Sequence, residues 1–317
     1  MKPLRIGSRG SKLALWQAEH IRERLARERG VSAEIVIIKT SGDKFQSSAV
    51  AQVSGEAGGK GIFIKEIEDA LLDGRVDVAV HSMKDVPTET PRGLCFPAIT
   101  RREDPRDCLI SRRGETLVKL ASGASIGTSS LRRQSQLLHF RRDLRVAELR
   151  GNVDTRIRKL ESGQFDAIVV AKAGLERLGL APNITEIISP EVMLPAVGQG
   201  ALAIEAREGD ADVRGAIAAF DDADTRLAVT AERALLSELE GGCQVPLGAW
   251  ARRESGKLQL DACVLSADGA ECIRRSTSAT CRNLTEAEEL GRRVATELLD
   301  AGADRLLQLA GRSAGGA

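Results

Sequence analysis

Aromatic side chains are scarce in this sequence of 317 residues, which has two tryptophans, six phenylalanines and no tyrosine. A surface that binds single-stranded nucleic acid by stacking bases on aromatic rings is therefore not expected. Excess charge is also missing, since 46 Lys and Arg against 45 Asp and Glu leave a formal net charge of +1. This balance excludes a polybasic nucleic-acid tail and an acidic solvating chain.

Long apolar runs and paired cysteines are missing too. No run of eighteen apolar residues occurs, and the first nine residues lack the apolar core of a signal peptide, so we expect no membrane partner and a cytoplasmic location. The six cysteines include no C-x-x-C pair, and we interpret them as free thiols. Zinc-protease, clustered Cys/His and serine-hydrolase motifs are absent, and no metal site is predicted.

The first hundred residues alternate strand and helix patterns. Short apolar runs at residues 4–7, 33–39 and 76–80 predict strands, the second of them buried. Between the first two, Ser11 begins a helix that Gly30 ends. Strands that alternate with helices indicate a parallel α/β sheet.

The alternation restarts after Pro105 in a second α/β lobe, and residues 201–206 predict a strand that returns to the first lobe. From Asp222 the pattern changes to a long helix, three strand-like runs and a final helix, which is typical of an α+β domain. The predicted fold class is thus two α/β lobes plus a small α+β C-terminal domain. The predicted domains comprise residues 1–99 with 200–219, residues 100–199, and residues 220–317.

Positive charge gathers in the second lobe. Between residues 132 and 158, eight arginines stand against three acidic residues, a local net charge of +5. Several of these arginines fall at strand ends and helix starts, where open α/β sheets bind ligands, so a polyanionic small ligand is expected. For any single arginine, a solvated helix face is the structural alternative. The turn at residues 127–130 precedes Arg132 and Arg133 and adds hydroxyls and helix N-terminal amides.

Two further segments have the composition of a reaction site. The pentad of residues 81–85 follows an apolar strand, and Asp85 is suited to stabilise charge or move a proton. A surface ion pair between Lys84 and Asp85 explains this pentad equally well. Two glycines precede Cys243, which suits the approach of a bulky group, although a lone cysteine is usually a small buried hydrophobe.

Taken together, eight segments in chain order make the sequence resemble the porphobilinogen deaminase (hydroxymethylbilane synthase) family from Arg5 to about Leu307. They are Ser8–Gln17, Gly58–Gly61, His81–Pro87, Gly127–Gln134, Arg150–Arg156, Ala173–Arg177, Gly198–Ala201 and Glu232–Gly248. The resemblance implies a monomeric three-domain enzyme whose first two lobes are similar to a periplasmic binding protein.

The same resemblance implies a transferase of tetrapyrrole biosynthesis. Such an enzyme deaminates porphobilinogen, joins four units head to tail on a dipyrromethane cofactor and releases hydroxymethylbilane by hydrolysis. Cys243 would hold that cofactor through a thioether. Loss of ammonia leaves an electron-poor azafulvene cation, which Asp85 would stabilise while accepting hydrogen bonds from the pyrrole N–H groups.

Further residues are assigned by the resemblance to the carboxylates that each ring bears. The cofactor would be bound by Ser82, Lys84, Thr128, Ser130, Arg132, Arg133 and Arg156. The incoming substrate would be bound by Arg9, Ser11, Gln17, Lys60, Arg150, Arg156 and Arg177. Lys60 lies on a polar, glycine-rich segment, residues 40–61, that we expect to be a mobile lid. Glu56 stands where some family members carry a lysine, so a second cationic contact from this segment is in doubt.

Two other functions stay open from the residues alone. A binding module for a dicarboxylate or phosphate would need the arginines but would have no use for Asp85 or Cys243. A nucleic-acid binder would use the arginine stretch, but the net charge of +1 and the scarce aromatics disfavour it. Steep salt dependence of binding to DNA or RNA would distinguish the last case.

Overall fold

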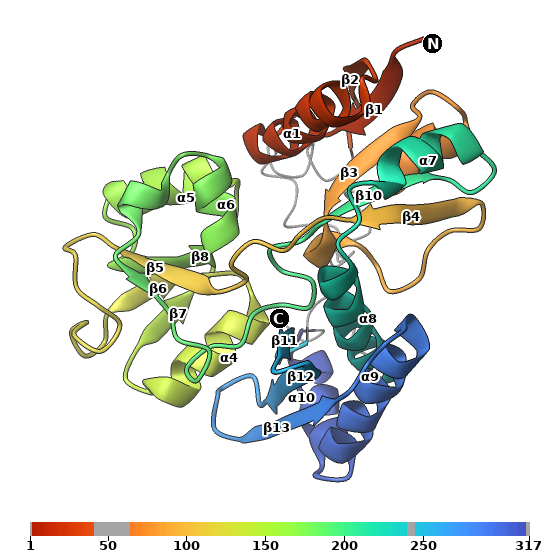
Figure 1. The fold of residues 1–317 in the computed structure, drawn as a ribbon. Helices are drawn as coiled ribbons and strands as arrows, with labels where there is room; N and C mark the ends of the chain where they lie inside the picture. The colour runs from red at the N-terminus through yellow and green to blue at the C-terminus, as the bar shows by residue number, and fades with distance from the viewer. Residues whose placement is uncertain (1, 41–63, 240–244, 315–317) are drawn as a thin grey trace. The chain divides into compact units, whose positions relative to one another are not determined.

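The structure is a computed structural model that describes residues 2–40, 64–239 and 245–314. It divides into two compact units (Figure 1). Unit 1 comprises Met1–Arg102 and Ala201–Arg226, and unit 2 comprises Glu103–Gly200 and Leu227–Ala317. The chain leaves unit 1 after Arg102, returns to it with the strand predicted at residues 201–206, and leaves it again after Arg226.

Unit 1 is built on one five-stranded sheet with the order β2-β1-β3-β10-β4. Its strands are β1 (Leu4–Ser8), β2 (Ala33–Ile37), β3 (Val78–Ser82), β4 (Leu94–Ile99) and β10 (Leu202–Arg207). Its helices are α1 (Lys12–Arg29), α3 (Lys65–Leu72) and α7 (Ala211–Ala218), with a short 3₁₀ turn at Met83–Asp85. Helices α1 and α7 contribute to the apolar core on one face of this sheet, and α3 packs on the other.

Helix α1 begins and ends as predicted. The Ser11 hydroxyl accepts a hydrogen bond from the backbone N–H of Ala14 at 3.3 Å, which satisfies one of the free amides of the first turn. Gly30 ends the helix with φ of 63°, a left-handed conformation that glycine adopts without steric cost.

Three details of the predicted sheet are wrong. The sheet is mixed, because β10 follows a crossover from unit 2 and pairs antiparallel with both β3 and β4. Strand β2 is not buried, since it pairs only with β1 at the sheet edge and leaves Ile37 58% exposed. Strand β3 continues to Ser82, so His81 and Ser82 belong to the strand instead of following it.

Unit 2 contains a second five-stranded sheet, with the order β7-β6-β8-β5-β9. Its strands are β5 (Asp107–Ser111), β6 (Ser125–Gly127), β7 (Arg145–Ala147), β8 (Ala167–Ala171) and β9 (Glu186–Ile187). Its helices are α4 (Leu131–Phe140), α5 (Val153–Glu161) and α6 (Lys172–Arg177), with a 3₁₀ turn at Ala181–Asn183. Here too one interior strand is antiparallel: β6 is parallel to β7 and β8, whereas β5 runs against β8.

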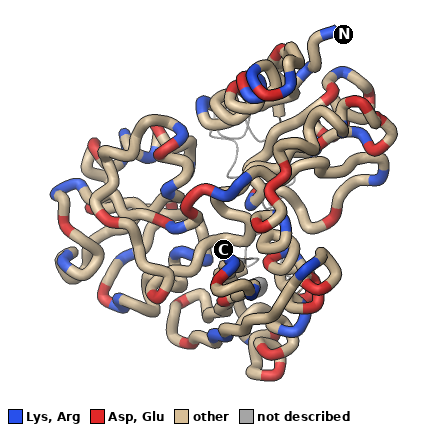
Figure 2. The backbone as a smooth tube through the Cα atoms, in the orientation of Figure 1, with Lys and Arg blue, Asp and Glu red and all other residues tan. Residues whose placement is uncertain are grey.

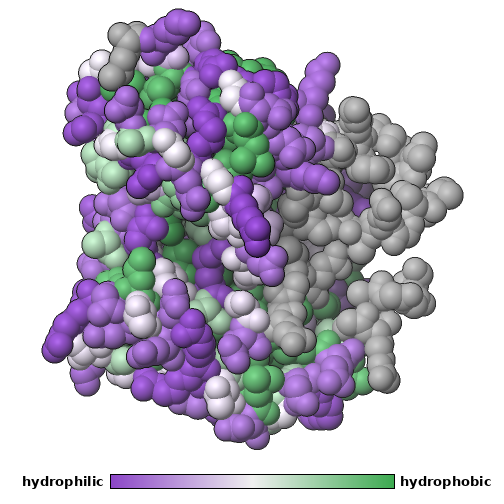
Figure 3. Space-filling model, turned by 90° about the vertical axis from the view of Figure 1, so that its right-hand side faces the viewer, coloured by the Kyte–Doolittle hydropathy of each residue, from purple (hydrophilic) through white to green (hydrophobic). Residues whose placement is uncertain are grey.

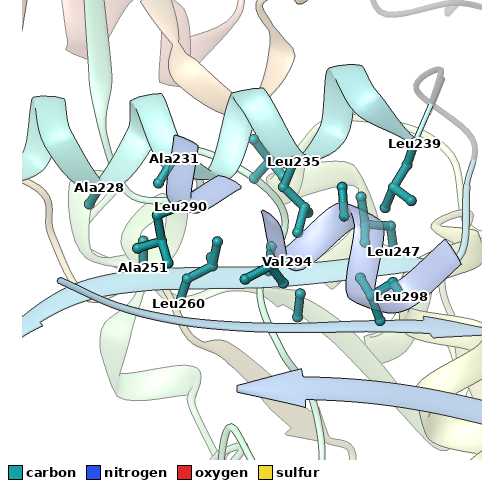
Figure 4. Close-up of a cluster of buried hydrophobic side chains, with 14 of the residues drawn as sticks. Ala228, Ala231, Leu235, Leu239, Leu247, Ala251, Leu260, Leu290, Val294 and Leu298 are labelled. Carbon is teal, nitrogen blue, oxygen red and sulfur yellow. The ribbon is translucent and has the colours of Figure 1, made fainter. Parts of the chain in front are cut away.

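The remainder of unit 2 is the predicted α+β region. An antiparallel sheet of β11 (Leu247–Glu254), β12 (Lys257–Leu265) and β13 (Cys272–Ala279) packs with α8 (Ala223–Glu238), α9 (Leu284–Leu299) and α10 (Ala303–Ala314). Figure 4 shows Ala231 and Leu235 of α8 pointing toward Leu290 and Val294 of α9. Gly291 permits the close helix crossing, since a Cβ there would lie 2.2 Å from the Ala231 carbonyl oxygen. The predicted fold class is confirmed.

On the face shown in Figure 3, hydrophilic residues predominate. Across the described ranges, no helix combines the length and apolar character needed to cross a bilayer.

Candidate active site

The parallel strands of unit 1 end at one edge of their sheet, and five of the predicted site residues gather there. Arg9 and Ser11 follow β1, Ser82 is the last residue of β3, and Lys84 and Asp85 form part of the 3₁₀ turn after it. Open α/β sheets bind ligands at this edge.

Asp85 is the chemically distinctive residue at this edge. Its side chain is half-buried, and its carboxylate makes no hydrogen bond or ion pair with any residue that the structure describes. The turn that holds it is anchored by Met83, which is 3% exposed and accepts a hydrogen bond from the Val86 amide. The alternative of a surface ion pair with Lys84 is not observed. A half-buried carboxylate without a partner suits a positive charge or an N–H donor.

Gln17, predicted to bind substrate, lies close to this turn and is buried. It is 3% exposed, and its Nε2 donates a hydrogen bond of 2.8 Å to the Ser82 hydroxyl. Because Gln17 belongs to α1 and Ser82 to β3, this bond fastens the end of the strand to the helix. Gln17 therefore supports Ser82, which itself is half-buried.

The corresponding edge of the unit 2 sheet collects hydroxyl and guanidinium donors. Thr128 and Ser130 follow β6, and Arg150 and Arg156 follow β7. Thr128 is 2% exposed and accepts the Ser130 amide at 3.2 Å, while the Ser130 hydroxyl bonds to no described residue. Helices α4 and α5 begin directly after these loops, so their positive N-terminal ends lie at the same edge.

Arg132 and Arg133 are buried and share one acidic partner. Each is 5% exposed, and both bind Asp107, the fully buried first residue of β5. Arg132 Nη1 lies 2.7 Å from Asp107 Oδ2, and Arg133 Nη2 lies 2.7 Å from Oδ1. Burial alone raises the pKa of Asp107, but the two guanidiniums outweigh it and hold that pKa well below its ordinary range. The solvated helix face is therefore excluded for these two arginines.

The cluster around Asp107 retains excess positive charge. Two guanidiniums face one carboxylate, and their other recorded contacts are neutral: Arg132 donates to the Leu194 carbonyl at 2.6 Å and Arg133 to the Val169 carbonyl at 3.1 Å. Burial of unbalanced charge is unfavourable unless an anion comes close. The residues at this edge therefore fit a group that bears carboxylates.

Figure 2 shows Lys and Arg interspersed with Asp and Glu along the tube. The remaining arginines of the predicted site differ in exposure. Arg177 is 7% exposed, binds Glu103 Oε2 at 2.9 Å and donates to the Gly200 carbonyl at 2.8 Å. Burial lowers the pKa of Arg177 and raises that of Glu103. Arg150 is exposed and pairs with Glu148, while Arg156 is half-buried and donates to the Gly151 carbonyl at 2.8 Å.

Cys243 and Lys60 lie outside the described residues, as do residues 41–61 of the predicted lid. The five described cysteines are free thiols, as expected. Burial raises the pKa of Cys108 and of Cys263 to about 12, which leaves these thiols unreactive at neutral pH. Within the described ranges, no group of three or more His, Cys, Asp and Glu side chains is arranged to hold a metal ion.

Sequence reasoning missed Asp107 and Gln199. The Gln199 amide donates to Asp107 Oδ1 at 2.9 Å and to the Pro105 carbonyl at 2.6 Å, which adds a neutral donor to the buried carboxylate. The available signal was an acidic residue directly before the apolar run of residues 108–110.

Comparison with known families covers almost the whole chain. A family model described as "Porphobilinogen deaminase, dipyromethane cofactor binding domain" matches residues 4–215, and "Porphobilinogen deaminase, C-terminal domain" matches residues 226–300. The chain belongs to the porphobilinogen deaminase family. The resemblance predicted from eight sequence segments is thereby confirmed.

Relatives named porphobilinogen deaminase align with this chain over nearly its whole length and over nearly their own. The protein of Syntrophotalea carbinolica is 51% identical over 96% of this chain and 95% of its own length. That of Geobacter metallireducens is 50% identical over 96% of this chain and 94% of its own. Among solved structures, an ABC transporter periplasmic substrate-binding protein from Coxiella burnetii aligns with a TM-score of 0.42 and 16% identity, over 68% of this chain and 91% of that one.

Proposed function

We propose that this chain catalyses the reaction for which its family is named, with the two sheet edges performing different tasks. It is a transferase that deaminates porphobilinogen, joins four units on a dipyrromethane primer and releases hydroxymethylbilane. The match of residues 4–215 to the family's cofactor-binding domain carries this assignment. The charges at the two edges support the division of tasks that follows.

The unit 1 edge handles positive charge. As ammonia leaves the aminomethyl group of porphobilinogen, positive charge develops on the substrate, and the Asp85 carboxylate stabilises it. A carboxylate that has no other partner needs no reorganisation to do so, and its partial burial strengthens the attraction. The primer, when bound, supplies the pyrrole carbon to which the next unit is joined. Ser82 and Lys84 hold primer carboxylates beside this turn, and Gln17 orients Ser82.

The cationic and hydroxyl side chains, most of them at the unit 2 edge, handle negative charge. Every porphobilinogen unit bears an acetate and a propionate, and these carboxylates match guanidinium and hydroxyl donors. Primer carboxylates are bound by Thr128, Ser130, Arg132, Arg133 and Arg156. Incoming substrate is bound by Arg9, Ser11, Lys60, Arg150, Arg156 and Arg177, with Gln17 acting through Ser82. The excess positive charge around Asp107 favours this use of Arg132 and Arg133.

Cys243 holds the primer through a thioether. The intact mass of the denatured protein tests this, and Cys263→Ala provides a matched control because that thiol is buried and unreactive. We expect extra mass equal to two linked pyrrole units in the wild type and in Cys263→Ala, and no extra mass in Cys243→Ala. If unmodified wild-type protein gained no mass after incubation with porphobilinogen, the proposed reaction would be wrong and a binding module would replace it.

Several coarser predictions accompany this proposal. We propose a cytoplasmic monomer without a nucleic-acid or membrane partner, and three domains comprising residues 1–99 with 200–219, residues 100–199, and residues 220–317. Light scattering of the purified protein tests the monomeric state.

A further inference from the structure

The end of β3 is fastened on both faces of its sheet, directly before the turn that carries Asp85. Successive side chains of a strand point to opposite faces. Ser82 points toward α1 and accepts the hydrogen bond from Gln17. His81 points the other way, and its Nε2 lies 2.9 Å from Glu205 Oε2 in a buried hydrogen bond.

Glu205 comes from β10, the antiparallel neighbour of β3. The register pairs Glu205 with Ala79 and Ala203 with His81, so the Glu205 side chain reaches diagonally along one face to the imidazole. The ladder extends past the strand, because the Met83 amide donates to the Ala201 carbonyl at 3.0 Å. Side chains and backbone of β10 thus hold the same short stretch, and Asp85 follows two residues after it.

Burying the polar pair His81 and Glu205 is less favourable than packing the strand with apolar side chains. His81 is 5% exposed and Glu205 is fully buried, whereas the core cluster on the α3 face of the sheet is aliphatic. Glu205 Oε1 has no hydrogen-bond partner in the described part of the chain. Burial and the nearby Glu205 carboxylate raise the pKa of Glu68 on α3. Apolar side chains of similar volume usually fill such space at lower cost.

We propose that His81 and Glu205 are positioning residues for the reaction. They fix the backbone at the end of β3, and thereby hold the Asp85 carboxylate where positive charge develops on the substrate. This inference rests on the proposed function. Misplacing a charge-stabilising group affects the bond-making steps more than ligand capture, so their loss is expected to lower kcat and to leave KM and primer attachment largely unchanged.

Two substitutions of Glu205 test the pair. Glu205→Leu removes the acceptor of the His81 hydrogen bond at similar volume, and we expect a fall in kcat of about 10- to 100-fold with KM within about threefold of wild type. The denatured mass should still include the primer. Glu205→Gln retains an oxygen that accepts a hydrogen bond from His81, and it should restore kcat to within about threefold of wild type.

Asp77→Asn is the matched control, because Asp77 directly precedes the opposite end of β3. It binds Arg5 at 2.8 Å and Arg207 at 3.1 Å, so its substitution breaks ion pairs beside the start of β3 without touching the end that leads to Asp85. We expect a lower melting temperature and an unchanged kcat.

The proposal is overturned if Glu205→Leu keeps wild-type kcat, if Asp77→Asn lowers kcat as much, or if Glu205→Leu lacks the primer mass. If Glu205→Leu does not fold, His81→Leu removes the same hydrogen bond and decides by the same three readouts. Failure of the proposed function is distinguishable, because wild-type protein would then show neither primer mass nor turnover.

Discussion

The two five-stranded sheets place their ligand-facing edges alike, but the acid at each edge has different partners. In unit 1, β1 lies between the parallel strands β2 and β3, and β10 next to β3 runs antiparallel. In unit 2, β6 lies between the parallel strands β7 and β8, and β5 next to β8 runs antiparallel. The unit 1 edge offers Asp85, an acid without a partner among the described residues. The unit 2 edge contains Asp107, an acid paired with two guanidiniums and an amide. The topology thus places an acid at the same edge of each sheet. The partners of each acid distinguish the proposed catalytic role of Asp85 from the structural role of Asp107.

Asp85→Asn is expected to have the largest effect on activity and almost none on stability. No hydrogen bond or ion pair joins this carboxylate to a described residue, and in the proposed function it meets developing positive charge, so we expect kcat to fall by about 100-fold or more. The free energy of unfolding should change by less than about 0.5 kcal/mol. Steady-state kinetics and urea unfolding measure the two quantities, and denatured mass should show the primer retained. Wild-type turnover in this variant would remove Asp85 from the mechanism.

Asp107→Asn should show the opposite pattern. It leaves two buried guanidiniums without their carboxylate, and breaking a buried ion pair in this way typically costs about 3–5 kcal/mol. Urea unfolding measures the loss. Asp143→Asn is the control, because Asp143 pairs with Arg141 at the exposed surface and its removal should barely change stability. An equal loss of unfolding free energy in the two variants would show that the buried ion pairs of Asp107 stabilise the fold no more than an exposed pair does.

The pH dependence of stability separates Asp107 from other acids. Its pKa is lowered in the folded protein, so its contribution is fully present above the ordinary aspartate pKa near 4 and is lost as the pH falls toward the folded value. The difference in unfolding free energy between wild type and Asp107→Asn should therefore be constant at neutral pH and shrink below about pH 4. A difference that grew on acidification would contradict the assigned ion pairs.

The sequence predicted the features that depend on residues close together in the chain, such as the ends of helix α1. Ser11 and Gly30 bound α1 as expected, because a cap is made within one turn of the helix. Arg132 and Arg133 were predicted as site residues, but their partner Asp107 was not, since it precedes them by about 25 residues. Its position beside them follows from the antiparallel pairing of β5 with β8.

The same limit applies to the unit 1 edge. Gln17 was predicted to contact substrate, because nothing in the sequence relates it to Ser82, 65 residues away. His81 and Glu205 meet across 124 residues of sequence, through the strand that returns from the other unit. Glu205 stands out as the one acidic residue in the apolar run of residues 202–206, but the sequence does not indicate that its partner is His81.

Arg150→Ala should have the smallest effect. It tests whether the substrate is bound by Arg150 itself or attracted by the summed positive charge of the unit 2 edge. Arg150 is exposed and pairs with Glu148, so its loss should change the unfolding free energy by less than about 1 kcal/mol. If it binds a substrate carboxylate, KM should rise about tenfold, the equivalent of one charge-assisted hydrogen bond of about 1.4 kcal/mol. Arg158→Ala is the control, an exposed arginine of α5 that donates to Thr155 and has no assigned ligand. An equal rise of KM in both variants would mean that the unit 2 edge attracts substrate by its summed charge, and a rise confined to Arg150→Ala would mean that the loop after β7 places one guanidinium against one carboxylate.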